Sequence, residues 1–551
     1  METHTRTTSK FNKTFSSMDI LMIAFGAMIG WGWVVSTGDW IGTAGVIGAM
    51  LGFILGGVMI FFIGMTYAEL TPAMPECGGE HVFSMRAMGP VGSFVCTWAI
   101  ILGYVSVVCF EACALPTIIT YVWPQFLQGY LYTVAGFDIY ATWLATAIVF
   151  AIFITVINIM GAKTAAKLQN ILTLAIGAAG ILLIAASVVT GNPSNLDGQM
   201  FVGSGMQGMM GTIIKVAAVS PFFFIGFDVI PQAAEEINVP LKKIGKILIL
   251  SIVLGVTFYA LIIFSVGYVM NSGQIAASYN GSGLVTADAM ANAFHSTIMA
   301  KVLILAGMCG IITSWNSFMI GGSRAMYSMA ESYMIPRFFA RLHPKTNTPY
   351  IAILVVGLLS VLAPFAGRKM LVWIVDAGNF GCILAYCMVS SSFIILHVKE
   401  PTMPRPYKVK HWKFIGTMAV LMSAIMIMLY ILPGSGVTLA PQEWAMVAGW
   451  TLLGVVFFAF SKLVYKEKFG YYAQLAVSES AKAEESEESA TAVRAASTIM
   501  AAEASSPDEW SRGFDYFLPI NLVFGQGKIE QVGKIASSHM VSDRKSGSAG
   551  M

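Results

Sequence analysis

Long apolar stretches alternate with short polar connections along most of this chain. Twelve such stretches are expected to form helices: 18–36, 41–67, 91–123, 140–160, 168–189, 206–230, 247–270, 302–329, 351–365, 370–396, 414–432 and 444–464. Most reach the length of about 20 apolar residues that a helix needs to cross a hydrocarbon core of about 30 Å. The pattern therefore predicts an all-α integral membrane protein with about twelve transmembrane helices.

Composition supports the same prediction. Hydrophobic residues make up 56% of the 551 residues and charged residues 11%, whereas soluble domains carry about 25% charged residues. A membrane enzyme would need converging nucleophiles, acids or metal ligands, but the seven histidines fall near the ends of the stretches or in the tails. A channel would need a polar pore or a filter loop, and neither is visible. No cofactor, structural metal or nucleic acid partner is expected.

Basic residues are distributed unevenly between alternate connections. One side, which includes both termini, holds many of them, among them Lys13, Lys163, Lys242, Lys243, Lys246, Arg337, Arg341, Lys408, Lys410 and Lys466, whereas the other side holds Lys301, Arg368 and Lys369. Positively charged connections stay in the cytoplasm. The sequence thus predicts a cell membrane protein with both termini cytoplasmic.

Three regions follow from this pattern: a cytoplasmic N-terminal segment (1–17), a transmembrane transporter domain (18–468) and a mostly disordered cytoplasmic tail (469–551). Residues 479–506 are rich in Ala, Ser and Glu, and such a composition cannot bury a hydrophobic core. The apolar residues that return at 514–524 predict a short docking segment in the tail.

Two of the stretches contain residues that interrupt helices. Residues 26–32 include three glycines, and the sixth stretch carries Pro221, Gly226 and Pro231. Backbone freed inside a membrane is tolerated where it lines a cavity, and paired interrupted helices are typical of transporter sites. The N–H groups at a half-helix start favour a carboxylate, and the C=O groups at a half-helix end favour an ammonium group. Close helix packing is the alternative role for these glycines.

Four motifs in order along the chain resemble the amino acid–polyamine–organocation superfamily of permeases over about residues 15–464. They are GAMIGWG at 26–32, YAEL at 67–70 with MPECGGE at 74–80, FIGFD at 224–228 with AEEINVP at 234–240, and SRAMYSMA at 323–330 followed by IP at 335–336. The resemblance implies five-plus-five inverted repeats, broken helices 1 and 6, and peripheral helices 11 and 12. It also implies a substrate site between helices 1, 3, 6, 8 and 10.

The function implied by this resemblance is secondary active transport, as symporter or exchanger, of an amino acid or related organic amine. Alternating access would proceed by rocking of helices 1, 2, 6 and 7. A nutrient sensor built on a permease fold, or a polyamine or ethanolamine-type amine permease, is the alternative. The sequence leaves the coupling ion, H⁺ or Na⁺, open.

The resemblance also assigns roles to individual residues. It implies that the backbone around Ala27, at Met28, Ile29, Gly30 and Gly32, binds a carboxylate, that carbonyls of Phe224, Ile225 and Gly226 bind an amine, and that Phe222 covers the substrate. The chain departs from the family at Trp31, where a small or hydroxylated residue is usual, so a conventional α-amino acid is less securely implied. It also lacks the lysine that follows a threonine in helix 5 of proton-coupled relatives, because Thr173 is followed by LAIG.

Ionisable residues within membrane helices are costly and therefore functional candidates. Glu111 lies well inside the third stretch, where a carboxylate favours a cationic or amine-bearing substrate; a structural hydrogen bond is its alternative role. Asp228 is a site candidate expected mainly to order nearby N–H groups. Lys215 is expected at the outer interface, and Glu235 and Glu236 at the cytoplasmic end.

The eighth stretch carries a polar run from Thr313 to Ser317. Trp315 is predicted as a pocket wall and Asn316 as a group that bridges helices. The hydroxyls of Thr313, Ser314 and Ser317 could bind a sodium ion against helix 1, since hard cations prefer oxygen ligands. Alternatively, they bond to their own helix backbone.

Overall fold

The computed structural model describes residues 11–435 and 437–470, which belong to one compact unit of the chain. The N-terminal residues 1–10 and the predicted tail from residue 471, including the segment 514–524, lie outside the described residues. Within the described part, nearly all residues are helical, and eleven helical segments are long and apolar enough to cross a membrane. A shorter apolar helix, Tyr350–Ala366, takes the place of the ninth predicted stretch.

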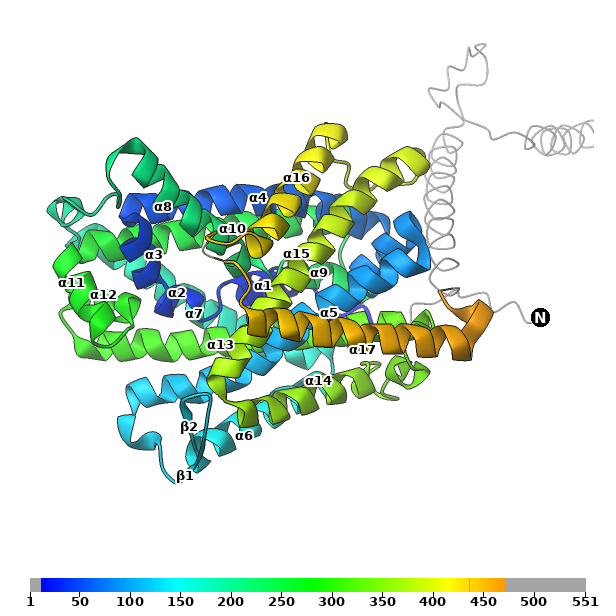
Figure 1. Cartoon of the computed structure of the whole chain (residues 1–551), viewed down its shortest axis with the longest axis horizontal. Helices are drawn as coiled ribbons and strands as arrows, with labels where there is room; N and C mark the ends of the chain where they lie inside the picture. Colours follow the sequence, from blue (N-terminus) through cyan, green and yellow to red (C-terminus); the bar gives the residue numbers. More distant parts are fainter. Residues whose placement is uncertain (1–10, 436, 471–551) are drawn as a thin grey trace, which may run out of the picture. The chain divides into compact units, whose positions relative to one another are not determined.

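The elements run in the following order along the chain (Figure 1). They are α1 (Ser17–Met28), α2 (Gly32–Val35), α3 (Thr37–Ala44), α4 (Val46–Ala73), α5 (Glu80–Val122), η1 (Pro124–Phe126), β1 (Tyr130–Val134), β2 (Phe137–Tyr140), α6 (Ala141–Ile159), α7 (Ala162–Thr190), η2 (Pro193–Leu196), α8 (Gly205–Val219), η3 (Ser220–Phe224), α9 (Val229–Gln232), η4 (Ala234–Glu236), α10 (Leu241–Val269), α11 (Ser272–Asn280), α12 (Val285–Phe294), α13 (Thr297–Glu331), η5 (Arg337–Ala340), α14 (Tyr350–Leu362), η6 (Ala363–Ala366), α15 (Gly367–Lys399), α16 (Trp412–Ile431), α17 (Pro441–Tyr465) and η7 (Lys466–Lys468).

The hydrophobic pattern did not predict every element. Between α5 and α6, strands β1 and β2 form an antiparallel hairpin whose last pair is Val134 with Phe137. Two short helices, α11 and α12, fill the connection between α10 and α13. Helix α5 begins eleven residues before the predicted stretch that starts at residue 91, because a helical turn before the kink at Gly89 continues into it. Short amphipathic or polar elements carry no long apolar signal, so periodicity alone misses them.

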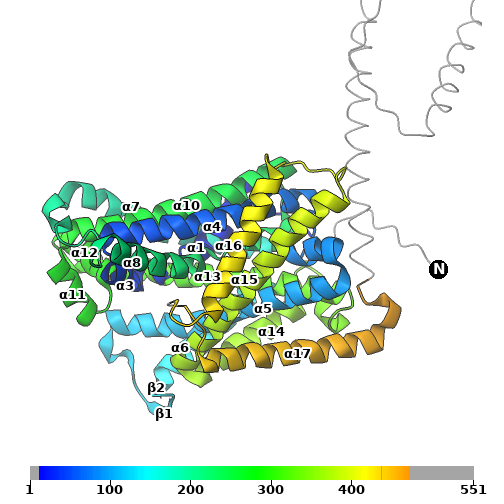
Figure 2. The ribbon, with the colours of Figure 1, turned by 45° about the horizontal axis from the view of Figure 1, so that its top comes forward.

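Helix α1 lies at the centre of the bundle and packs against α7, α10 and α13. Around this centre, α4 and α10 lie side by side, as both views show (Figures 1 and 2), and α15 packs along α5. Helix α17, in contrast, buries few side chains, namely Glu443, Gly454 and Ser461, and packs at the edge against α15 and α5. The interior is therefore built mainly from the first ten predicted stretches.

The N-terminal segment is joined to the chain that follows α9. Phe15 pairs in parallel with Ile237: the Phe15 N–H donates to the Glu236 carbonyl at 3.0 Å, and the Asn238 N–H donates to the Phe15 carbonyl at 2.8 Å. Ser16 then caps α1, since its side chain accepts from the Asp19 N–H and the Asp19 carboxylate accepts from the Ser16 N–H. This reciprocal capping satisfies two N–H groups at the helix start.

Candidate functional site

Two non-helical segments face each other inside the bundle. Helix α1 ends at Met28 and α2 begins at Gly32. Farther along the chain, η3 ends at Phe224 and α9 begins only at Val229. Proline at 221 removes one backbone donor from the helix that would otherwise continue, and residue 226 has φ of +139°, which only glycine adopts without strain.

These two segments are in direct contact. A Cβ placed on Gly226 would lie 2.6 Å from the Ala27 Cβ and 3.1 Å from the Met28 main-chain nitrogen. Only a residue without a side chain allows this approach. The contact brings the end of α1 and the start of the non-helical segment after η3 together, so both border the same space.

Side chains from three neighbouring helices hold the carbonyl groups of α1. The donors and acceptors are Thr173 to Met22 at 3.3 Å, Ser317 to Ile23 at 2.9 Å, Thr313 to Gly26 at 2.9 Å, and Tyr259 to Met28 at 2.8 Å. Of the three hydroxyls predicted to bind sodium, those of Thr313 and Ser317 therefore lie against α1 and donate hydrogen bonds to its backbone, whereas Ser314 interacts with Glu111. Thr173, the threonine of α7 that no lysine follows, is among these donors.

A cavity of about 240 Å³ opens beside the two non-helical segments. Its wall is mainly apolar and aromatic. The two non-helical segments with the helices next to them, and helices α5, α10, α13 and α15, contribute to it. The lining residues are Ala27, Met28, Gly30, Trp31, Gly32, Val35, Ser36, Val107, Phe110, Glu111, Ala114, Thr117, Ile118, Tyr121, Phe222, Phe223, Ile225, Tyr259, Ser314, Phe318, Val372, Val375 and Asp376. A concave, largely apolar space with a few polar groups is typical of a small-molecule site.

Two carboxyl groups line this cavity, and no lysine, arginine or histidine is among its lining residues. Glu111 on α5 is 6% exposed and interacts with Ser314 of α13. Asp376 on α15 lies against the Glu443 carboxyl of α17. The charged groups in the wall of the cavity are thus acidic, which favours a ligand that carries a positive charge.

The tryptophan that departs from the family pattern also belongs to the wall. The Trp31 ring is 8% exposed and covers Gly307 of α13, where a Cβ would lie 2.2 Å from the ring. Glycine at position 307 therefore makes room for the indole. The ring narrows the cavity on the side where α1 ends.

The predicted site residues divide into two groups. The cavity is lined by Ala27, Met28, Gly30, Trp31, Gly32, Glu111, Phe222 and Ile225, whereas Ile29, Phe224, Gly226, Asp228, Trp315 and Asn316 are not among its lining residues. Phe224 packs edge to face on Tyr259 with ring centroids 5.7 Å apart, and Ile29 is fully buried. Lys215 is exposed on α8 and is not among the lining residues either.

Two of the residues outside the wall, Asp228 and Asn316, have clear structural partners. Asp228 accepts from the Gly226 N–H at 2.8 Å and from the Tyr104 hydroxyl at 2.8 Å. Asn316 joins three helices, because its amide donates to Gln169 of α7 at 2.9 Å and its oxygen accepts from Asn158 of α6 at 2.9 Å. The predicted roles of Asp228 as an organiser of backbone and of Asn316 as a helix bridge agree with these contacts.

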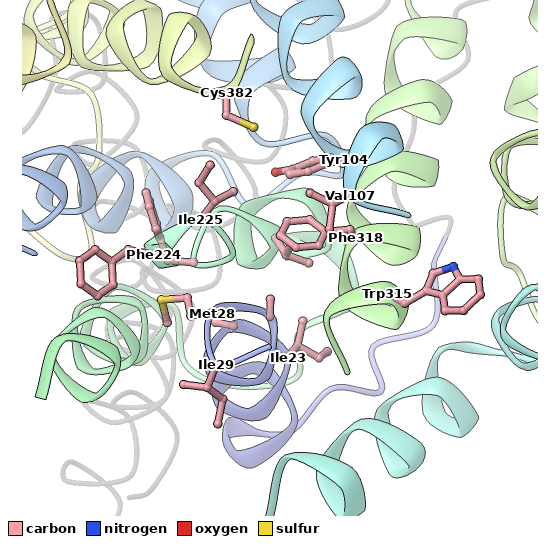
Figure 3. Packing of buried hydrophobic residues seen from close by; sticks show 14 of the residues in the cluster. Ile23, Met28, Ile29, Tyr104, Val107, Phe224, Ile225, Trp315, Phe318 and Cys382 are labelled. Atoms are coloured by element: carbon pink, nitrogen blue, oxygen red, sulfur yellow. The ribbon is translucent and has the colours of Figure 1, made fainter. Parts of the chain in front are cut away.

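Trp315 was predicted as a pocket wall, but its ring is fully buried elsewhere. In the close view, the indole points away from Phe318, Met28 and Ile23 (Figure 3). The cavity is instead lined from α13 by Ser314 and Phe318, which are four residues apart and share one helix face. Trp315 is one position farther round the helix, by about 100°.

Several lining residues were not singled out from the sequence, and Asp376 is the most informative of them. It is an acidic residue inside the apolar stretch 370–396, so the signal that identified Glu111 could also have found it. Tyr259, Thr117 and Phe318 carry no such signal, because aromatic and hydroxyl residues are common in membrane helices for packing alone.

The sequence matches known transporters over most of its length. A family model described as amino acid permease matches residues 15–458. The chain is 26% identical over 436 residues to the branched-chain amino acid permease BcaP of Bacillus subtilis (strain 168), which covers 76% of this chain and 88% of that protein. It is 25% identical to the methylthioribose transporter of the same organism, over 82% of this chain and 94% of that protein. It is also 25% identical to the aspartate-proton symporter of that organism, over 76% of this chain and 79% of that protein.

Proposed function

Because the chain belongs to the amino acid permease family, we propose that it is a secondary active transporter of an amino acid or a related organic amine and works by alternating access. The family and its transporter relatives indicate a multi-pass membrane transporter rather than an enzyme. The relatives differ in the solute that their names give, from branched-chain amino acids to methylthioribose and aspartate. The substrate must therefore be argued from the cavity of this chain.

The observation that carries the proposal is the cavity beside the two touching non-helical segments. It is bordered by Met28, Gly30 and Gly32 from one segment and by Phe222 and Ile225 from the other. Peptide groups at such helix ends are free to bind charged solute groups. The N–H groups near residues 30–32 would bind a substrate carboxylate, and carbonyls of residues 224–226 would bind its amine.

Glu111 and Asp376 extend this site with negative charge. Both line the cavity, and a buried carboxylate gains most from a ligand that brings an opposite charge. A substrate with an amine at the end of its side chain, or an organic amine without a carboxylate, fits this arrangement. Trp31 limits the space near the proposed carboxylate contact, which also favours a compact amine.

Helix packing supports the inverted repeat that the family resemblance implies. If helices 1–5 correspond to helices 6–10, contacts should recur with the repeats exchanged. Packing of α15 on α5 then corresponds to α13 on α7, packing of α1 on α10 to α8 and η3 on α4, and packing of α5 on α6 to α13 on α14. These three correspondences support two interlocked repeats, whereas the packing of α1 on α7 and α13 has no counterpart of similar extent among the described residues.

The proposed orientation rests on the distribution of positive charge. With both termini in the cytoplasm, the loop that contains Lys408, Lys410 and Lys413 is cytoplasmic, and the hairpin of β1 and β2 is extracellular. The positive-inside rule supports this arrangement. Labelling of single cysteines placed at Asp138 and at Lys410 in intact cells tests it: only the first should react with an impermeant reagent.

Transport by purified protein in liposomes tests the function. We expect a thermal-shift screen of neutral and cationic amino acids, polyamines and ethanolamine-like compounds to identify ligands, since a ligand that binds the folded state raises its melting temperature. Liposomes preloaded with such a ligand should then accumulate labelled ligand by exchange. Binding without any exchange or uptake would overturn the transporter proposal and favour a nutrient sensor.

A further inference from the structure

A second acidic site lies outside the cavity, next to the chain that runs from η3 to α9. Glu80 begins α5, and Asp228 ends the non-helical segment before α9; both are fully buried. The Gln232 amide donates to Glu80, and Gln232 lies four residues after Asp228, which brings the two carboxyl groups into the same buried region. The two carboxyl groups therefore form a buried pair, which we call the Glu80–Asp228 pair.

The contacts of this pair are all uncharged. Glu80 accepts a short hydrogen bond from the Gln232 amide. Asp228 accepts from the Gly226 N–H and from Tyr104, at 2.8 Å each. The Tyr67 hydroxyl of α4 interacts with Glu80, and the Tyr386 hydroxyl of α15 interacts with Asp228. The thiols of Cys96 and Cys382 lie nearby.

Nearby basic side chains are engaged elsewhere. Arg324 donates to Glu236 at 2.8 Å. The ring nitrogens of His81 lie 3.1 Å from the Thr97 hydroxyl and 2.8 Å from the Ser332 hydroxyl. Among the described residues, no lysine, arginine or histidine is therefore paired with Glu80 or Asp228. Burial of two carboxylates without a positive partner costs much free energy, because water no longer solvates their charge, and such groups bind a proton instead.

The site also contains unused hydrogen-bonding capacity. Within the described residues, Gln232 Oε1 has no hydrogen-bonding partner. The side chains of Gln232, Glu80, Tyr67 and Tyr386 are all fully buried. Aromatic rings crowd around them: Tyr67 lies 5.3 Å from Phe227, and Phe227 lies 5.4 Å from Tyr386, between ring centroids. A proton fits this crowded site, because it needs no coordination space.

We propose that the Glu80–Asp228 pair binds the proton that drives transport, an inference that rests on the transport activity proposed above. One carboxyl of the pair holds the proton while the pair is buried. When the surrounding helices separate and water enters, the carboxylate becomes stable and the proton leaves. The pair would thus take the role that a lysine of helix 5 is expected to have in proton-coupled relatives.

Asp228 links this proton to the substrate cavity. Its carboxylate accepts a hydrogen bond from the Gly226 N–H. Gly226 follows Ile225, which lines the cavity, and is itself in contact with Ala27, another lining residue. A protonated carboxyl gains an O–H donor and keeps only part of its acceptor capacity, so proton binding changes the hydrogen bonds at the segment that borders the substrate. Glu80 acts on the same segment from its other end, through Gln232 of α9.

Purified protein in liposomes that contain a pH-sensitive dye tests the proposal, with the substrate identified by the thermal-shift screen. In wild-type protein, substrate uptake should bring protons with it, and an inward proton gradient of one pH unit should support up to about tenfold accumulation at one proton per substrate. Sodium gradients should have no effect. Uptake of substrate without proton movement, or with sodium dependence, would overturn the proposal even if no variant could be purified.

Glu80→Gln separates proton coupling from transport. The variant keeps the size and the hydrogen-bonding capacity of the side chain but cannot exchange a proton. Substrate exchange between preloaded liposomes and medium should persist, whereas accumulation driven by the proton gradient should fall to simple equilibration. Glu400→Gln is the matched control, because Glu400 forms a partly exposed salt bridge with Arg86 and is not part of the Glu80–Asp228 pair. This variant should accumulate substrate like wild type.

The two proposals fail in different ways. If wild-type protein exchanges no substrate at all, the transporter function fails. If wild type accumulates substrate with protons and Glu80→Gln does so equally well, transport stands and the Glu80–Asp228 pair is not the proton site. Asp228→Asn provides a second variant with the same expected loss of accumulation.

Discussion

Buried acidic residues occur in this protein in two different settings. Glu69 of α4 lies 2.8 Å from Arg405 and 3.1 Å from His397, and Glu236 lies 2.8 Å from Arg324. Glu80, Asp228 and Glu111, together with the partly buried Asp376, have no basic partner among the described residues. A buried carboxylate with a basic partner holds two segments together, because loss of either member leaves an uncompensated buried charge. One without such a partner is free to respond to a ligand or a proton, which suits a transporter.

The largest expected effect distinguishes the two settings by stability. Glu69→Gln leaves Arg405 without its buried anion, and loss of one member of a buried pair costs about 3–5 kcal/mol. Glu80→Gln replaces a carboxyl that has no basic partner and should cost about 1 kcal/mol or less. Thermal unfolding of both variants in the same detergent measures this difference. Equal losses would contradict the division into paired and unpaired carboxylates.

The next effect concerns substrate charge. We expect Glu111→Gln to weaken binding of cationic substrates by about 1.5–3 kcal/mol, the range for hydrogen bonds to charged groups, and neutral substrates much less. Competition of cationic and neutral compounds against labelled substrate measures the ratio. Equal affinities for both classes in wild type and variant would remove Glu111 from the substrate site.

A smaller effect is expected at the other carboxyl of the cavity. Asp376 lies against Glu443, so Glu443 can carry part of the negative charge when Asp376 is neutralised. Asp376→Asn should therefore weaken cationic substrates by about 0.5–1.5 kcal/mol. The double variant Asp376→Asn with Glu443→Gln should lose more than the single one. A double variant that binds like wild type would exclude this pair from substrate recognition.

The smallest effect marks the limit of the comparison at the surface. Glu400 forms a salt bridge with Arg86, with side chains 34% and 20% exposed. Water screens such a pair, so Glu400→Gln should cost about 0–1 kcal/mol. Its melting temperature should lie close to that of wild type. A loss as large as that of Glu69→Gln would show that pairing, rather than burial of the pair, determines stability.

The sequence predicts the membrane helices and much of the cavity, because both depend on local features. Long apolar stretches indicate the spans, and the glycines and prolines at 26–32 and 221–231 mark the segments that border the cavity. Glu111 is identifiable from its depth within its stretch. A predicted stretch as short as 351–365 still forms a helix, although one too short to meet the length of a full span.

What the sequence does not predict depends on contacts between distant segments. The partners of Glu69 lie more than 300 residues away in the chain, so nothing local distinguishes it from Glu80, eleven positions later. Likewise, the helix rotation that turns Ser314 toward the cavity and Trp315 away from it follows from packing of α13 against its neighbours. Asp376 differs from these cases, because an acidic residue inside the apolar stretch 370–396 is a local signal of the same kind as Glu111.

The pairing of Phe15 with Ile237 has a mechanical consequence. Because these main chains are hydrogen-bonded immediately before α1 and shortly after α9, the two interrupted segments are tethered at one end of the bundle. A tilt of either segment therefore displaces the other, so the two segments should move together relative to the rest of the bundle. Deletion of the residues up to and including Phe15 would remove these hydrogen bonds. The groups that bind substrate would stay in place, but the two segments would no longer move together.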